Sequence, residues 1–169
     1  MHGAIEQALR EQFAVDHTQQ FRKALEHCND LLFFLDNAGE IVFDKILIEE
    51  LLRHAPVTAV VKGGPIINDA VMADAEQVGL PDVCEVIDNG GSFIGSPLSR
   101  IPDWFRTRMD QADVLVGKGQ GNYETLDGYP GEVFLILRAK CEIVAQHMGV
   151  RYGQVALIST RARAARRDR

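Results

Sequence analysis

Short apolar runs alternate along the chain with segments in which apolar residues recur every three or four positions. The runs are LLFFL, VTAVV, VCEVI, DVLVG, VFLIL and QVALI, and all of them lie between residues 31 and 158. Their near-continuous apolar character favours strands that are buried on both faces. Strands that alternate with amphipathic helices predict an α/β fold, in which helices cover both faces of a mainly parallel sheet.

The segments between these runs have the spacing of helices that bury one face. They are residues 44–54, 67–79, 101–111 and 141–149. We therefore expect a three-layer α/β/α architecture with a mainly parallel, Rossmann-like sheet.

The two ends of the chain differ in pattern from its middle. In residues 1–30 apolar residues such as Ile5 and Leu9 recur at four-residue spacing, which predicts a short N-terminal helical segment. The last nine residues contain five arginines and almost nothing apolar, as is typical of a solvated tail. We expect the helical segment at 1–30, an α/β domain at 31–160 and a basic tail at 161–169.

Composition narrows the classes of partner. A length of 169 residues with 46% apolar residues suits one globular domain, and the net charge of −6 argues against a nucleic-acid-binding surface spread over it. Three cysteines without metal-ligand spacing predict a reducing, cytoplasmic setting. The apolar runs are far shorter than the roughly 20 residues of a membrane span, and the sequence shows no apolar leader. We therefore expect neither a membrane partner nor secretion.

Polar residues gather where the predicted strands end. Asp36, Asn37 and Glu40 follow the first strand, and Lys62, Asn68 and Asp69 follow the second; the segment KGQGNYE, residues 118–124, follows DVLVG. In an open α/β sheet, ligands bind outside the carboxyl ends of the strands. The chemistry is therefore expected at one rim of the sheet.

The acids and amides of the first two loops suggest a metal site. Asp36, Asn37 and Asp69 offer hard oxygen ligands from adjacent loops, which suits Mg²⁺ or Mn²⁺. These loops lack cysteine and histidine, so a structural zinc site is disfavoured. The alternative for Asp36 and Asn37 is a helix cap or a turn, because both residue types accept backbone hydrogen bonds there.

The segment KGQGNYE suggests a phosphate site. Lys118 stands among glycines that allow backbone amides to approach an anion closely, although the spacing is not that of a Walker A loop. The alternative is a glycine-rich turn without a ligand. A metal held by carboxylates beside a lysine points to metal-assisted displacement at phosphorus, of which hydrolysis of a phosphate ester is the simplest case.

Three longer motifs carry a family resemblance. DNAGEIVFDK, KGGPIINDA and KGQGNYETL, in this order, resemble the DUF89 family, the damage-control phosphatases with an ARMT1-like fold, over about residues 31–158. The short microbial branch is the most similar. Only about 30 residues precede the first motif, so most of the family's usual N-terminal helical region is expected to be lacking.

The resemblance implies a metal-dependent phosphatase that acts on small phosphometabolites, such as sugar phosphates or damaged cofactor intermediates. It implies Mg²⁺ or Mn²⁺, with Co²⁺ or Ni²⁺ as alternatives. Attack by water would be metal-assisted. By this resemblance the residues divide into metal ligands (Asp36, Asn37, Asp69), catalytic residues (Asp36, Asn68, Lys118, Glu40), substrate-binding residues (Lys118, Gly119, Asn122, Glu124, Lys62) and Asp44, which would line or brace the site.

Two other functions stay open at this point. One is a non-catalytic module that binds phosphometabolites. The other is a methyltransferase, which is weaker because no glycine-rich loop follows the first strand, where cofactor binding would ordinarily place it.

Overall fold

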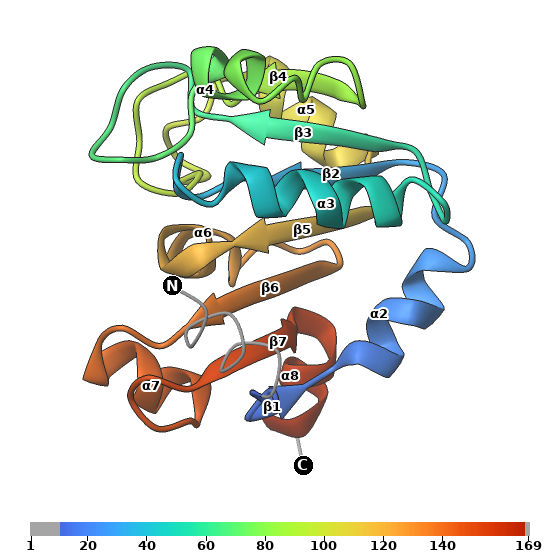
Figure 1. Ribbon diagram of the computed structural model, residues 1–169. Coiled ribbons are helices and arrows are strands. Elements are labelled where there is room, and N and C mark those ends of the chain that lie inside the picture. The colour runs from blue at the N-terminus through green and yellow to red at the C-terminus, as the bar shows by residue number, and fades with distance from the viewer. Residues whose placement is uncertain (1–10, 168–169) are drawn as a thin grey trace.

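Seven strands form one sheet in the computed structural model, which describes residues 11–167 (Figure 1). Their order is β1-β7-β6-β5-β2-β3-β4. Every neighbouring pair is parallel except β6 and β7, which are antiparallel. The expectation of a mainly parallel sheet is confirmed.

The strands are β1 (Val15–Asp16), β2 (Leu31–Phe34), β3 (Val57–Val61), β4 (Glu85–Asp88), β5 (Val114–Lys118), β6 (Val133–Arg138) and β7 (Val155–Ser159). The helices are α2 (Thr18–Leu25), α3 (Ile41–Leu51), α4 (Met72–Gln77), α5 (Asp103–Gln111), α6 (Gly119–Leu126), α7 (Glu142–Met148) and α8 (Thr160–Arg167).

Alternate residues of the central strand β2 belong to two separate cores. Leu31 and Phe33 pack with apolar residues of α2, α3 and α4, whereas Leu32 and Phe34 pack with those of α5, α6 and α7. Successive side chains of a strand point to opposite faces, so both faces of the sheet are covered. This confirms the three-layer α/β/α architecture and explains why LLFFL is apolar without interruption.

The segment KGQGNYE is not a loop, as its glycines suggested, but the end of β5 and the start of α6. Lys118 is the last residue of β5, and α6 begins at Gly119. Glycine is a poor helix former. The helix forms because Asn122, Tyr123 and Leu126 are buried, and tertiary packing supplies most of the stability of short helices.

The second loop also differs from the sequence expectation. The helix predicted over residues 67–79 begins only at Met72, because the chain first returns to the end of the sheet. The amide of Lys62 donates to the carbonyl of Ala70 at 2.9 Å, and the amide of Ala70 donates to the carbonyl of Asp36 at 2.8 Å. Residues 62–71 therefore form a loop that closes back on the ends of β2 and β3.

Both ends of the described chain join the sheet. Residues 11–30 contain α2 but also β1, which pairs with β7; the part of the predicted helical segment before residue 11 lies outside the described residues. The predicted basic tail is instead the helix α8 up to Arg167, and residues 168–169 lie outside the description. Arg161 pairs with Glu132 at 3.3 Å and Arg163 pairs with Asp127, so this segment is not frayed.

None of the helices within residues 11–167 is long and apolar enough to cross a membrane.

Candidate functional site

The ends of β2, β3 and β5 meet at one rim, and β2 lies between the other two strands. From β2 the chain runs outward through β3 and β4 and then returns to β5 on the other side, so β2 and β5 flank a topological switch point. Ligands of open α/β sheets bind in the crevice at such a point. Asp36 follows β2 here, and Lys118 ends β5.

The Asp36 carboxylate packs directly over the start of α6. A Cβ atom on Gly119 would lie 1.9 Å from Oδ2 of Asp36, and Gly119 has a φ of +80°, so only glycine allows this approach. The start of a helix presents unpaired backbone N–H groups and a partial positive charge. Asp36 thus lies beside partial positive charge, but it is largely shielded from water, which disfavours its charged form.

The loops after β2 and β3 are joined by backbone contacts. Asn37 and Asp69 form an isolated antiparallel bridge, and the amide of Ala38 donates to the carbonyl of Asn68 at 2.9 Å. Oδ1 of Asn37 accepts a hydrogen bond from the amide of Gly39 at 2.7 Å. The structure therefore brings together all three residues that the sequence predicted as metal ligands.

Charge crowding perturbs the two acids. Burial raises the pKa of Asp36 to about 6, and the carboxylates of Asp69 and Glu40 push it the same way, while Lys62 and Lys140 oppose them. Burial also raises the pKa of Asp69, against the effect of Lys62. Both carboxylates thus lack a full counter-charge.

These residues fit a hard divalent cation. Within residues 11–167 no group of three or more His, Cys, Asp or Glu side chains could hold a metal. Mg²⁺, however, keeps several waters and is usually bound through one or two carboxylates. Asp36 and Asp69 offer two carboxylates of this kind, and the Asn37 amide oxygen, which accepts the Gly39 amide, keeps a second lone pair.

Lys118 belongs to a second cluster of charges on the β5 side. Its Nζ lies 2.6 Å from Oδ1 of Asp44 and 3.4 Å from Oε2 of Glu40. Burial alone would lower the pKa of Lys118, but the two carboxylates outweigh it and raise the pKa above its ordinary value. Lys118 is therefore held as an ammonium, with Asp44 as the brace that the resemblance implied.

A cavity of about 310 Å³ opens beside Asp36 and Lys118. Its lining consists of Glu11, Phe13, Asp36, Glu40, Lys118, Gly119, Gln120, Ile136, Leu137, Arg138, Lys140 and Val155. Gln120 belongs to the segment KGQGNYE that was predicted to bind phosphate, but no role was assigned to Gln120 or to Lys140. Because Lys140 follows the end of β6 by two residues, the strand-end rule applied to β6 could have found it.

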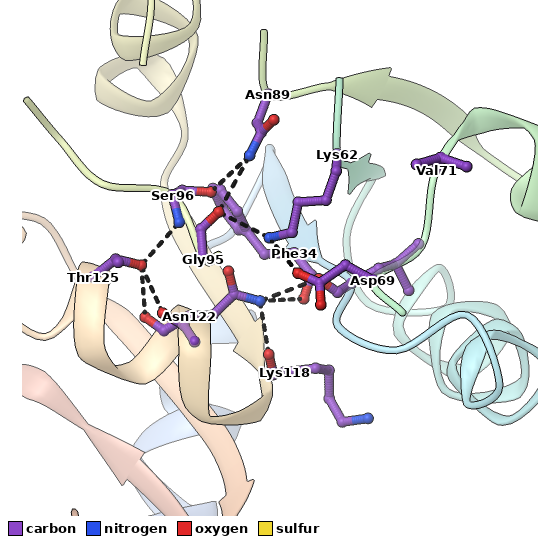
Figure 2. Close-up of polar contacts among 12 residues, drawn as sticks. Phe34, Lys62, Asp69, Val71, Asn89, Gly95, Ser96, Lys118, Asn122 and Thr125 are labelled. Atoms are coloured by element: carbon purple, nitrogen blue, oxygen red, sulfur yellow. Dashed lines mark hydrogen bonds and ion pairs between the residues drawn. The ribbon is translucent and has the colours of Figure 1, made fainter. Parts of the chain in front are cut away.

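Three predicted substrate-binding residues do not line this cavity. Asn122 is fully buried, and its amide donates to the carbonyls of Lys118 at 2.7 Å and Leu35 at 3.1 Å, so it clamps α6 to the end of β2 (Figure 2). Glu124 is exposed and accepts a bond from Gln120 one turn earlier. It borders a separate cavity of about 240 Å³.

Lys62 is the third of these residues. Its side chain is 3% exposed, and Nζ lies 2.9 Å from the carbonyl oxygen of Gly95 and 3.5 Å from Oδ2 of Asp69. Figure 2 shows its side chain between these two partners. Asn68, which was predicted to be catalytic, is exposed on the loop beside Asp69.

Comparison with known proteins gives consistent matches. A family model described as the damage-control phosphatase ARMT1-like domain matches residues 1–155. The damage-control phosphatase PH1575 of Pyrococcus horikoshii is 36% identical over 152 residues, and a damage-control phosphatase of Archaeoglobus fulgidus is 35% identical over 154 residues. An uncharacterised protein of Methanocaldococcus jannaschii is 36% identical over 161 residues.

These alignments cover 88%, 89% and 91% of this chain but 53% of each relative. The crystal structure of the DUF89 family protein PH1575 matches the fold with a TM-score of 0.88 at 34% identity, and the match covers 94% of this chain and 56% of that one. The chain thus spans about half the length of the curated relatives it matches.

Proposed function

Because the chain belongs to the damage-control phosphatase ARMT1-like (DUF89) family, we propose that it is a phosphatase that hydrolyses small phosphorylated metabolites with a bound divalent cation. One observation carries the proposal. Asp36, at the end of β2, and Lys118 and Gly119, at the junction of β5 and α6, line one cavity at the switch point of the sheet. Two of the family-like motifs therefore meet where an α/β sheet binds its ligand.

Asp36, Asn37 and Asp69 would hold the cation. When bound, Mg²⁺ or Mn²⁺, or alternatively Co²⁺ or Ni²⁺, would polarise a phosphoryl oxygen and assist ionisation of the attacking water. The two carboxylates would supply the negative charge that attracts a cation. Because burial raises the pKa of each acid and so disfavours its charged form, a bound cation would in turn stabilise both carboxylates. Asn37 contributes a neutral oxygen from the same loop.

Lys118 would bind the phosphate group. Its ammonium borders the cavity and is oriented by Asp44 and Glu40, so one donor direction can point to a phosphate oxygen while the acids hold the others. The first backbone amides of α6, beginning at Gly119, lie next to it and favour the same anion. Glu40 would act by holding Lys118, and Asn68 would contact the phosphate from the opposite loop.

The cavity supports a small substrate. A volume of about 310 Å³ lies at the lower end of the range for small-molecule sites, which suits a phosphorylated sugar or a cofactor fragment of similar size. Ile136 and Val155 offer it an apolar wall, and Lys140 stands at the rim with a further positive charge. Three unpaired cysteines agree with the proposed cytoplasmic setting.

The test measures phosphate release by the chain from a panel of sugar phosphates, with Mg²⁺, Mn²⁺, Co²⁺ or Ni²⁺ and with chelator controls. We expect metal-dependent release that falls at least 100-fold in Asp69→Asn and stays unchanged in Asp82→Asn, which alters an exposed acid after α4. Binding of a sugar phosphate without release under every metal would instead favour the non-catalytic module.

A further inference from the structure

The proposed phosphatase chemistry assigns no role to Lys62. It follows β3 directly, and its backbone is held by the bond to Ala70 and by a bridge to Val71. Its side chain is buried and does not line the cavity, so its ammonium is not accessible to a substrate there. A buried lysine is costly unless it has partners that justify its charge.

Both polar contacts of the ammonium that the structure defines are acceptors. Nζ donates to the carbonyl oxygen of Gly95 and faces Oδ2 of Asp69 (Figure 2). An ammonium, which carries three donors and no acceptor, satisfies both. Burial lowers the pKa of Lys62, and the carboxylates of Asp69 and Asp36 oppose this shift and favour the charged form. The electrostatic effect of Lys62 also reaches the Asp36 carboxylate, where it opposes the rise in pKa. Lys62 therefore serves as a counter-charge to both acids of the pair.

The carbonyl of Gly95 belongs to loop 89–96, which is buried at its two ends and exposed at residues such as Ile94 between them. The side-chain amide of Asn89 also donates to this carbonyl, at 3.3 Å, and the amide of Ser96 donates to Oγ1 of Thr125 in α6 at 2.8 Å. Gly95 has a φ of +66°, and a Cβ atom there would lie 2.2 Å from the carbonyl oxygen of Gly121. The end of loop 89–96, at Gly95 and Ser96, thus packs against α6, and Lys62 links this end to Asp69.

We propose that Lys62 is a positioning residue that sets the divalent-cation affinity of the Asp36–Asp69 pair and couples cation binding to the packing of loop 89–96. This inference rests on the proposed function, because it assumes that the pair binds a cation. Lys62 neutralises part of the charge that attracts the cation and holds one oxygen of Asp69. Its presence weakens cation binding, which keeps the bound cation exchangeable, while fixing the orientation of Asp69.

The first test is calorimetric titration of the full chain with Mn²⁺. Lys62→Gln removes the charge but keeps a neutral donor, and Lys62→Met removes both. Each variant should bind Mn²⁺ about tenfold more tightly than the wild type or better, since one unit charge close to a divalent cation has an effect of this size even with strong screening. Lys45→Met is the matched control, because Lys45 also donates to backbone carbonyls, those of Val78 and Gly79. Its Mn²⁺ affinity should stay within about twofold of the wild type.

The second test needs no substitution. When Mg²⁺ takes up the charge of Asp69, the ammonium should rely more on the carbonyl of Gly95. Hydrogen exchange of loop 89–96 should then slow at least threefold on saturation with Mg²⁺, whereas exchange in α8 should not change.

The outcomes separate the two proposals. Absence of any Mn²⁺ binding by the wild type would refute the metal site of the proposed function. Binding by the wild type with equal or weaker affinity in Lys62→Gln would overturn the role of Lys62 alone. If both Lys62 variants fail to fold, the hydrogen-exchange test decides. The role of Lys62 is then overturned if Mg²⁺ saturation leaves the hydrogen exchange of loop 89–96 unchanged in the wild type.

Discussion

Lys62 and Lys118 stand at the ends of β3 and β5, the two neighbours of β2, yet their surroundings differ. The Lys62 side chain is 3% exposed and lies between an acid and a backbone carbonyl, whereas the Lys118 side chain is 16% exposed and borders the cavity. Both ammonium groups face carboxylates. Lys118 can contact a substrate because it borders the cavity. Lys62 is buried and can act only through its neighbours.

The acids on the two sides differ as well. On the Lys118 side, Asp44 approaches the ammonium to 2.6 Å, which makes a close ion pair. On the Lys62 side, Lys62 lies 3.5 Å from Asp69, while Asp36 is influenced by both Lys62 and Lys140. Each cluster contains one lysine and two acids, but only the β5 cluster holds its lysine in an ion pair as short as 2.6 Å. The acids beside β2 and β3 are therefore less closely compensated, and a cation would be attracted there.

The largest expected effect tests the close ion pair beside β5. Asp44→Ala removes the nearest counter-charge of Lys118 and should lower the free energy of unfolding by about 3–4 kcal/mol, as measured by urea denaturation. Glu50→Ala on the same helix is the control, because Glu50 pairs with Arg53 on the exposed surface, and it should cost less than about 0.5 kcal/mol. Equal small losses in both variants would show that the Lys118–Asp44 pair contributes no more than a surface pair.

The next effect tests the cost of ionising Asp36 beside β2, in metal-free buffer. The pKa of Asp36 is about 6 in the folded chain against an ordinary 3.8, so ionisation destabilises the fold as pH rises from 3.8 through 6. The full cost, about 3 kcal/mol, is present above pH 6 and absent below pH 3.8.

Asp36→Asn removes this cost. Compared with the wild type, the variant should therefore gain about 2 kcal/mol in unfolding free energy on going from pH 4 to pH 8 in the presence of chelator, since part of the cost is already present at pH 4. Asp82→Asn should show no such pH-dependent gain. A constant difference between Asp36→Asn and wild type at both pH values would mean that Asp36 carries no excess charge cost.

The third effect tests which lysine meets the substrate. Lys118→Ala should reduce kcat/KM for phosphate release by about 10- to 150-fold, because a charge-assisted hydrogen bond contributes roughly 1.5–3 kcal/mol. Its Mn²⁺ affinity should change little, in contrast to the Lys62 variants. Lys118→Arg, which keeps the charge with a planar geometry, should recover part of the activity if charge matters most. Full activity in Lys118→Ala, in a variant shown to be folded by circular dichroism, would make Lys118 architectural.

The smallest expected effect concerns backbone strain. The β5 side and the loop before Asp69 also differ in this respect. On the β5 side the left-handed residue is Gly119, but in the loop before Asp69 it is Ile67, with a φ of 49° and 80% exposure. A β-branched residue is strained in this conformation, and asparagine tolerates it better.

Ile67→Asn should raise the free energy of unfolding by about 1 kcal/mol in thermal or urea denaturation. Val42→Asn is the control, since Val42 is also exposed but lies in the helix α3, and it should give no gain. Equal effects of the two substitutions would show that the loop stores no strain at Ile67.

Much of this arrangement was predictable from local pattern. The apolar runs identified β2 to β7 to within a few residues, because strands buried on both faces need continuous apolar character. The rule that ligands bind at strand ends placed Asp36, Asp69 and Lys118 near one another. Local pattern failed for α6. Its glycines suggest a turn, but the segment forms a helix because Asn122, Tyr123 and Leu126 are buried.

The amino-acid sequence by itself determined the strands β2 to β7, the motifs that mark the family and the acids at the strand ends, because these follow from local apolar periodicity and short motifs. It did not reveal β1, which lies in the segment predicted to be helical. Only the tertiary structure decided the environment of each charged group. Lys62 and Lys118 look alike in the sequence, each followed by glycine after an apolar run, but loop 89–96 buries one and the β5–α6 junction opens the other to a cavity. Burial and charge pairing depend on segments distant in the chain, and they determine what each lysine can do.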